Sequence, residues 1–253
     1  MISRNLKDFR TFVKEREREF FVLENKVNFS EKIEPKDVKE LRRLVKNKKI
    51  PLGNIIVNKA FYDKNNHDFF QLFYNTKRTD FSGIEKWDVS KIKFFKKAFW
   101  LCDHFTGKEI ENWDISGAIT IDQMFQDCPN FNANLSKWKV EKIVFHELNE
   151  VFWGCKNFTG KGLENWNVRN ITSMDHLFAH CEKFNTDLSK WDVSNVENLR
   201  GAFNGCKNFT GKGLEKWNLS KVKNCKNIFM NSGVKNIPEN FRKKAKELGQ
   251  ELF

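Results

Sequence analysis

The chain of 253 residues lacks the features of membrane-spanning, fibrous and disordered proteins. It has no apolar run long enough to form a helix that crosses a membrane. With 4 Pro and 13 Gly it is neither collagen-like nor a Pro/Gly-rich low-complexity chain. It has only 2 Tyr, but 26 Phe and 8 Trp, and disordered segments are poor in aromatic residues. Residues 1–8 carry no apolar signal segment, so we expect a cytoplasmic protein, with the cell surface as the alternative.

Sequence patterns for catalysis, for cofactor binding and for metal binding are also missing. There is no Ser/His/Asp set, no glycine-rich cofactor loop and no Cys-x-x-Cys pair. His176 and His180 have i, i+4 spacing, but Leu177 stands where a zinc protease would have Glu, and no second His pair supports a metal site. Thr-Gly-Lys recurs three times without the rest of a phosphate-binding loop. We therefore predict a protein that is not an enzyme and that uses no cofactor and no metal.

The formal net charge of +12 is concentrated at the two ends of the chain. Residues 1–50 carry 15 Lys/Arg against 9 Asp/Glu, and residues 221–253 carry 8 against 3, whereas residues 51–220 carry 22 against 21. A basic surface attracts acidic proteins and nucleic acids. The basic ends are therefore either solvated surface or a contact for an acidic partner. The candidate contact residues at the C-terminal end are Arg242, Lys243, Lys244 and Lys246.

A sequence repeat runs through most of the chain. Each copy opens with a Trp, and consecutive copies are 25 to 28 residues apart: Trp87, Trp113, Trp138, Trp166, Trp191 and Trp217. Phe follows the Trp after 12 residues, Cys after 15 and a second Phe after 18, and the copy that begins at Trp138 contains two extra residues. Units of this size cannot bury an apolar face alone, so they must stack on their neighbours.

Within one copy, the sequence predicts a short strand followed by a short helix. Trp-Asp-Val-Ser-x-Val alternates apolar and polar residues, as a strand does. The helix is predicted from the i, i+3, i+4, i+7 spacing of Met174, Leu177, Phe178 and Cys181. The expected fold class is therefore α/β, a leucine-rich-repeat-like right-handed solenoid of ~25-residue coils.

The repeat resembles that of a known bacterial family. Residues 185–203 begin Asn-Thr-Asp-Leu-Ser-Lys-Trp-Asp-Val-Ser-Asn-Val and end at Phe203. This is similar to the repeat of about 26 residues in bacterial surface proteins of the BspA-like leucine-rich-repeat family. The resemblance is close over 81–235 and extends back to residue 34. It implies a leucine-rich-repeat fold and a role as a surface or adhesion protein.

Both ends of the chain predict helical caps over the repeat. Apolar helical stripes occur in residues 4–22, 35–47 and 239–252. Solenoids need such caps to cover the open faces of their first and last coils. The expected parts are a helical N-terminal cap (1–57), a repeat solenoid of about seven coils whose first and last coils are degenerate (58–235), and a C-terminal capping helix (236–253).

The regular positions of the repeat predict a core. The repeat Trp and Phe residues recur once per coil, which favours core packing over an exposed aromatic platform for nucleic acid or glycans. A column of reduced, buried thiols is predicted in the same way from Cys102, Cys128, Cys155, Cys181 and Cys206. Cys225 lies outside this column.

The irregular positions predict contacts with a partner. Trp100 and Trp153 lie outside the Trp register and each directly follows a core Phe, so we expect them to be exposed anchors. A row of cations at every second copy consists of Lys108, Lys161 and Lys212. This row either marks solvated turns or can contact an acidic partner.

A stack of repeats without catalytic residues predicts a non-enzymatic binding protein whose partner is a macromolecule, in the first place a protein. Two alternatives stay open. One is an intracellular binder or inhibitor of a nucleic acid or ribonucleoprotein, for example in phage–host conflict, that uses the basic caps and whose binding depends steeply on salt. The other is a bacterial surface adhesin, as the family resemblance implies.

Overall fold

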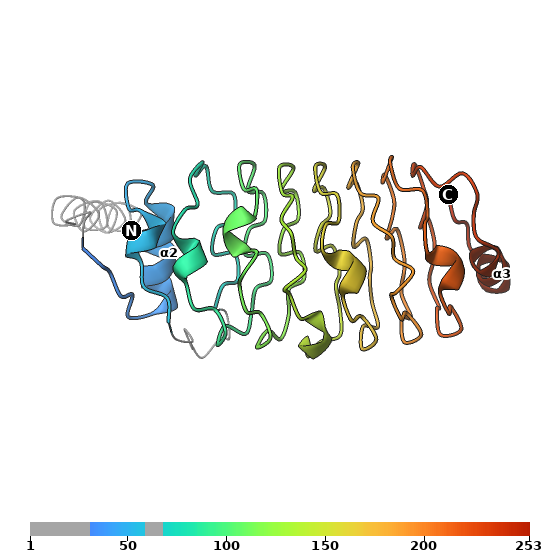
Figure 1. Ribbon diagram of the computed structural model, residues 1–253, viewed down its shortest axis with the longest axis horizontal. Helices are drawn as coiled ribbons and strands as arrows, with labels where there is room; N and C mark the ends of the chain where they lie inside the picture. Colours follow the sequence, from blue (N-terminus) through green and yellow to red (C-terminus); the bar gives the residue numbers. More distant parts are fainter. Residues whose placement is uncertain (1–30, 59–67) are drawn as a thin grey trace, which may run out of the picture.

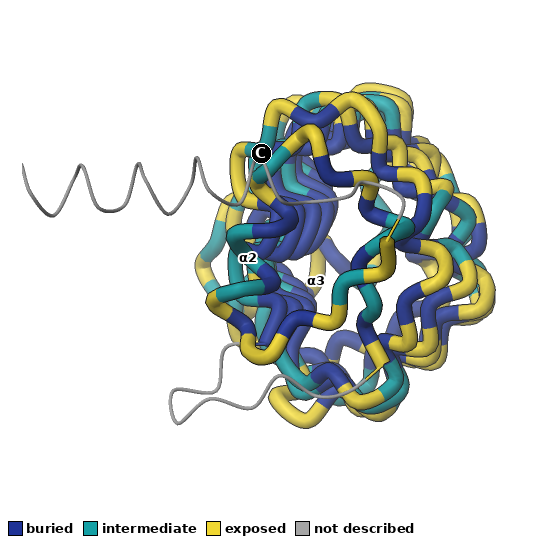
Figure 2. Tube along the Cα trace, turned by 90° about the vertical axis from the view of Figure 1, so that its left-hand side faces the viewer, coloured by how far each residue is buried: buried dark blue, intermediate teal, exposed yellow. Residues whose placement is uncertain are grey.

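The computed structural model describes residues 31–58 and 68–253. They form an elongated stack of coils with helix α2 (Val38–Lys46) at one end and helix α3 (Glu239–Leu248) at the other (Figure 1). Viewed along the stack, the buried positions of successive coils lie behind one another (Figure 2). Short 3₁₀ helices occur in the turns: η1 (Leu52–Asn54), η2 (Ile84–Lys86), η3 (Lys108–Ile110), η4 (Val140–Lys142), η5 (Leu163–Asn165) and η6 (Leu214–Lys216).

Neighbouring coils are joined by backbone hydrogen bonds in the segment that ends just before the repeat Cys. Met174, His176 and Phe178 donate their N–H groups to carbonyl oxygens of the next coil at 2.8 to 2.9 Å. The N–H groups of Leu177 and Ala179, each one residue further along, close turns onto carbonyls three residues earlier. We call this segment of all coils the turn ladder, and its outer surface the ladder face. It comprises 68–75, 94–101, 120–127, 147–154, 173–180, 198–205 and 224–231.

The helix predicted between Met174 and Cys181 is wrong. His176 and His180 have positive φ angles of 51° and 61°, which an α-helix does not contain. Two consecutive four-residue turns place their apolar residues on one side at the same spacing as a helix does, so the sequence pattern does not separate the two structures. The left-handed residues rotate alternate N–H groups toward the next coil, where they find acceptors.

The strand predicted at Trp-Asp-Val-Ser is also wrong. The described coils share isolated parallel bridges rather than extended strands, and most of these lie in the turn ladder, as between Ser173 and Asn198. After Trp191, the Asp192 carboxylate accepts the N–H of Ser194 at 3.0 Å and closes an Asx turn. This turn explains why Asp or Asn follows most of the repeat Trp residues. The α/β solenoid class and the three-part division of the chain stay predictions.

Phenylalanine rings fill the interior along the stack, as predicted. Phe178 is fully buried, and its ring stacks on Phe152 and Phe203 of the neighbouring coils with centroids 5.7 Å apart. Within its own coil it stacks on Phe184 at 4.1 Å. The first coil, although degenerate, continues the column, because Phe73 stacks on Phe99 at 4.8 Å. Two columns of Phe therefore connect the coils.

The repeat Trp residues belong to the same core, which confirms their predicted position. They are only 3% or 4% exposed. Each indole donates its N–H to a backbone carbonyl 28 to 35 residues earlier in the chain; Trp191 Nε1, for example, lies 2.8 Å from the Leu163 oxygen. A buried indole needs such an acceptor. Trp thus adds a directional bond between coils to the burial of its ring.

The repeat cysteines form the predicted column of buried, reduced thiols. All six Cys residues of the chain are free and buried. Cys181 Sγ donates to the Phe152 carbonyl at 3.0 Å, and the other repeat cysteines make the equivalent bond. Burial raises the pKa of the Cys181 and Cys206 thiols well above the ordinary value. Cys225 is buried at the position that Met174 occupies in its own coil.

Helix α2 confirms the helix predicted over 35–47. Asp37 caps its start by accepting the Glu40 N–H at 2.7 Å. The sequence did not indicate the role of Arg78, which is buried and donates to the carbonyls of Val45 at 2.7 Å and Ile50 at 3.0 Å. It thereby satisfies backbone oxygens at and beyond the end of α2. The helix predicted at 4–22 lies outside the described residues.

Helix α3 ends at Leu248, earlier than the predicted residue 252. Gly249, with φ of 61°, ends the helix in the left-handed conformation that glycine adopts readily. The chain then runs back along the last coil, where residues 251 and 252 accept the N–H groups of Asn227 and Phe229 at 2.8 Å. The C-terminal tail therefore covers the open edge of the turn ladder, as exposed edges require.

We predict that Phe178→Ala lowers the free energy of unfolding by about 3–5 kcal/mol, because it leaves a cavity between stacked rings. Chemical denaturation measures the change. Phe145→Ala is the matched control, since Phe145 is 54% exposed and its truncation should shift the midpoint little. Equal midpoints for Phe178→Ala and wild type would contradict the Phe column.

We also predict that all six thiols react slowly in the native chain and rapidly after denaturation. Burial keeps reagents away from all six thiols, and at Cys181 a hydrogen bond to a carbonyl and a raised pKa further oppose formation of the reactive thiolate. Timed maleimide labelling read by mass spectrometry tests this. Rapid native labelling of the five repeat cysteines would show that the column opens to solvent.

Candidate functional site

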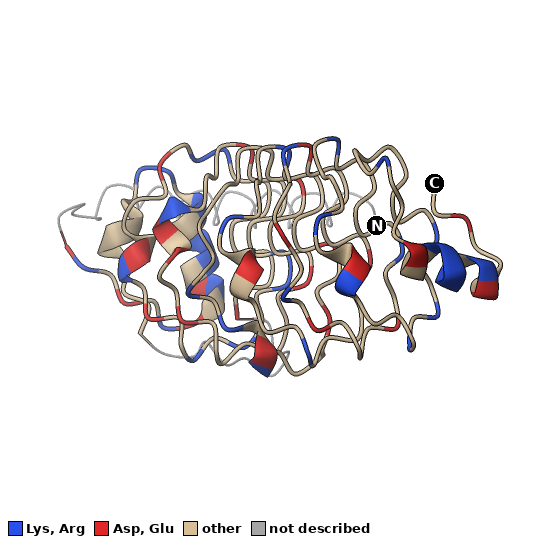
Figure 3. Ribbon diagram, turned by 45° about the vertical axis from the view of Figure 1, so that its right-hand side comes forward, with Lys and Arg blue, Asp and Glu red and all other residues tan. Residues whose placement is uncertain are grey.

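The predicted basic residues lie on separate parts of the surface. Lys108, Lys161 and Lys212 are exposed at equivalent positions of alternate coils. Lys212 is paired with Asp187 at 3.0 Å. The exposed basic residues of helix α3 lie at the far end of the stack (Figure 3). The row and the α3 cluster thus belong to different regions.

Lys244 does not belong to the exposed α3 cluster, contrary to the sequence prediction. It follows Phe241 by three residues and so lies on the helix face that packs on the last coil. Only 7% of Lys244 is exposed, and its Nζ donates to Glu247 Oε1 at 2.9 Å and to the Ser220 carbonyl at 3.4 Å. The exposed cations of the cluster are Arg242, Lys243 and Lys246.

Trp100 and Trp153 occupy equivalent positions on the ladder face, and both are partly exposed. Trp100 has close neighbours. The Tyr74 ring lies 4.8 Å from it, and Lys97 Nζ lies 4.1 Å from its centroid. Trp153 has the ring of His180 at 6.3 Å. The two predicted anchors therefore share a position but differ in their surroundings.

Charges on the ladder face are segregated along the stack. We number the coils from the repeat Trp that opens each, so that Trp87 begins coil one and Trp138 coil three. Coil one presents Lys96 and Lys97. The middle coils present Asp127, Glu147, Glu150 and Asp175, with Asp122 buried beneath them. Coils five and six present Arg200 and Lys226. The face therefore has an acidic middle with basic flanks, a pattern that the near-neutral total over 51–220 conceals.

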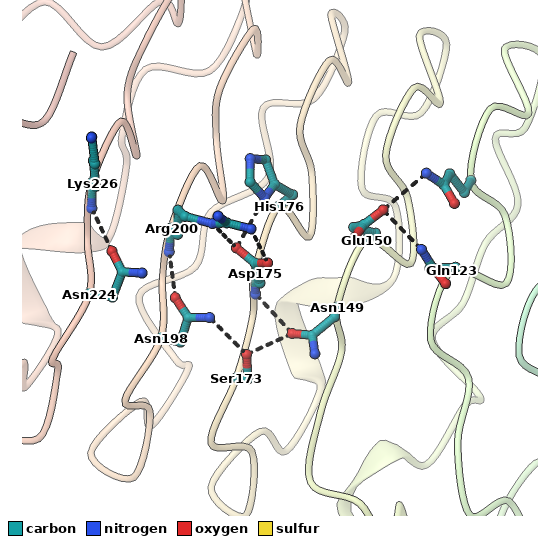
Figure 4. Close-up of polar contacts among 11 residues, drawn as sticks. Gln123, Asn149, Glu150, Ser173, Asp175, His176, Asn198, Arg200, Asn224 and Lys226 are labelled. Carbon is teal, nitrogen blue, oxygen red and sulfur yellow. Dashed lines mark hydrogen bonds and ion pairs between the residues drawn. The ribbon is translucent and has the colours of Figure 1, made fainter.

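The carboxylates of the acidic middle have different partners (Figure 4). Asp175 accepts two hydrogen bonds of 2.9 Å from Arg200 and lies 3.0 Å from His176 Nδ1. Although burial opposes ionisation, these contacts lower the pKa of Asp175 to about 2. Glu150 instead accepts hydrogen bonds from the neutral amides of Gln123 and Gln126, at 3.1 and 3.0 Å. Asp175 is thus neutralised within the chain, whereas Glu150 receives only neutral donors.

Coil three departs from the regular repeat through its two extra residues. The insertion exposes Val144 and Phe145, which are 57% and 54% exposed. Elsewhere in the described residues only Tyr74 and Phe253 are large apolar side chains with comparable exposure. The spacing of the repeat reveals the insertion, but it does not indicate that this pair is exposed. We call Val144, Phe145, Glu147, Glu150 and Trp153 the coil-three surface.

Within residues 31–58 and 68–253, no group of three or more His, Cys, Asp or Glu side chains is arranged to hold a metal ion. His176 and His180 lie on turns and not on the predicted helix. In the same ranges, none of the helices combines the length and apolar character that a bilayer crossing requires.

Comparison with known families gives two adjacent matches, over residues 67–147 and 146–241. Both are to the family described as "Mycoplasma protein of unknown function, DUF285". The chain belongs to the DUF285 family. This family is related to the BspA-like repeats. The match therefore confirms the expectation of a bacterial repeat protein. No curated protein and no solved structure matches the chain. The two DUF285 matches meet at His146 and Glu147, next to the exposed pair of coil three.

Asp122→Asn should stabilise this DUF285 chain at neutral and higher pH. Burial, and secondly the charge of Glu147, raise the pKa of Asp122 to about 6, so folding favours the protonated acid. The stability from this group is fully present below the unfolded pKa of about 4 and is lost as the pH rises through about 6. Asn stays neutral, so at about pH 8 it should add about 1–3 kcal/mol, a gain that vanishes near pH 4.

Urea unfolding of both chains at several pH values measures this difference. Asp187→Asn is a control for which the stability should change with pH in the opposite direction. Hydrogen bonds from Ser189 and Lys212 lower the pKa of Asp187 to about 2, so folding favours its ionised form. The free energy of unfolding of Asp122→Asn minus that of wild type should change with pH. If this difference is constant, folding does not raise the pKa of Asp122.

Proposed function

We propose that this DUF285 chain is a non-enzymatic binding protein, a leucine-rich-repeat-like right-handed solenoid of the BspA-like type, whose ladder face recognises a protein partner. The observation that carries the proposal is the coil-three surface. It places an exposed apolar pair, two carboxylates and a partly exposed Trp on one coil in the middle of a regular stack.

The backbone beneath this surface supports a binding role. Leu148, Glu150 and Phe152 donate their N–H groups to the next coil at 2.8 to 3.1 Å. Side chains above such a ladder need little further ordering when a partner binds, which reduces the entropic cost of association. Val144, Phe145 and Trp153 add the apolar and aromatic area that anchors protein interfaces.

The charge of the ladder face favours a protein over a nucleic acid at this site. The carboxylates of coils two to four would repel phosphate groups. The alternative, a nucleic-acid or ribonucleoprotein binder, is favoured by Arg242, Lys243 and Lys246, which are exposed on helix α3. We therefore treat the two surfaces as rival sites. Location in the cytoplasm or at the cell surface stays a prediction and does not affect this choice.

Three variants separate the rival sites. We predict that Val144→Ser combined with Phe145→Ser loses the partner captured from the native lysate, and that Trp153→Ala speeds dissociation of that partner. Replacing Arg242, Lys243 and Lys246 together by Gln should leave capture intact. Denaturation midpoints near that of wild type serve as the folding control.

The readouts are capture with and without nuclease, and dissociation rates at two salt concentrations. A nucleic-acid partner would reverse the pattern. In that case the α3 variant would lose binding, nuclease would abolish capture, and affinity would fall steeply with salt. Full binding by both coil-three variants would overturn the proposed site.

A further inference from the structure

Trp100 and Trp153 stand at the same ladder position but differ in the residue one turn before them. In coil one that residue is Lys97, whose Nζ lies 4.1 Å from the Trp100 centroid. In coil three it is Glu150. Among the described residues no Lys or Arg lies over the Trp153 ring as Lys97 lies over Trp100. The chain therefore provides a cation over one of two equivalent indoles and has a carboxylic acid residue at the corresponding position before the other.

The carboxylates near Trp153 have no cation bound to them in the described part of the chain. Glu150 forms no ion pair there, although Asp175 in the next coil is bound by Arg200. Asp127 lies in the preceding coil; its backbone N–H donates to the Trp153 carbonyl at 2.7 Å, and its carboxyl interacts with the side chain of Trp100. Burial raises the pKa of the Asp127 carboxyl. Partly desolvated carboxylates of this kind gain most from a nearby positive charge.

Gln126 places a buried acceptor without a partner next to Glu150. Its side chain is 4% exposed, and its Nε2 donates to Glu150 Oε2 at 3.0 Å. Its Oε1 is buried and has no hydrogen-bond partner in the described residues. A buried acceptor without a donor costs free energy. A donor that reaches the Glu150 carboxylate, with a small rotation of the amide, would also satisfy Gln126.

We propose that Glu150 and Trp153 form a seat for an arginine side chain of the protein partner. The proposal rests on the proposed function and names the chemistry of the partner. The guanidinium would stack on the Trp153 indole, as the Lys97 ammonium lies over Trp100, and would donate to Glu150. Arginine fits better than lysine because its planar group can stack on the ring and donate to the carboxylate and to Gln126 together. The exposed pair Val144 and Phe145 would contact apolar residues beside that arginine.

Two peptides that differ only in arginine or citrulline test the seat on the full chain. Citrulline keeps the shape of arginine and removes its charge. The readout is the NMR signal of each indole N–H, assigned with Trp→Phe variants. The arginine peptide should shift the Trp153 signal saturably and the Trp100 signal little, and the citrulline peptide should shift neither.

Exchange of the two charges gives a sharper test. Glu150→Gln should weaken binding of the arginine peptide about tenfold or more. Glu150→Lys should abolish binding, because it places a cation over Trp153. Lys97→Glu should create a second seat at Trp100. The matched control is Glu182→Gln, because Glu182 is already paired with Lys207 at 2.9 Å. It should bind like wild type.

Some outcomes would overturn the seat. These are equal shifts of Trp100 and Trp153 in the wild-type chain, equal binding of the citrulline peptide, or unchanged affinity of Glu150→Gln. If the arginine peptide fails to bind while the Val144–Phe145 variant still loses its protein partner, the seat is wrong and the protein-binding function stands. If the peptide binds as expected but no coil-three variant affects the protein partner, the seat exists and the proposed function fails.

Discussion

The alternation of backbone N–H directions in the turn ladder is the constraint on which the rest of the structure depends. Within one segment, the backbone N–H groups point alternately toward the next coil and back into their own coil. Phe178 is an example of the first direction and Ala179 of the second. These groups thereby find acceptors without an extended strand or a helix. This arrangement fixes which side chains face inward, and it sets neighbouring coils at the distance where their Phe rings stack.

The same alternation creates the positions that carry distinctive surface chemistry. Two residues of each turn-ladder segment take left-handed φ angles, and coils three and five use Gly at some of these positions, as at Gly154 and Gly201. Glu150 and Lys97 occupy the equivalent position with φ of 54° and 58°. A residue with a Cβ has a higher conformational energy at these angles than Gly, because its Cβ approaches the backbone. The same position carries Gln123 in coil two and His176 in coil four, so Glu150 and Lys97 are distinguished by the charge of their side chains and not by the backbone angle.

The sequence predicts the interior better than the outside. Phe178, Cys181 and Trp191 recur at fixed spacing because each must meet its counterpart in the next coil, so periodicity alone places them in the core. The secondary structure between them was not predictable in this way, because consecutive turns and a helix share the same apolar spacing. Lys244 was misplaced for a related reason. A basic run on a helix does not reveal which of its members faces the neighbouring coil.

The candidate site was harder to predict because it consists of departures from the repeat. A periodic pattern directs attention to what is conserved between coils, whereas Val144, Phe145 and Glu150 matter because they differ from their counterparts. In a stack, each coil contacts only its neighbours, so an insertion in one coil leaves the packing of distant coils unchanged. The Phe column continues through coil three, where Phe152 stacks on Phe125 and Phe178. Coil three therefore keeps the common interior while it presents a surface that the other coils do not have.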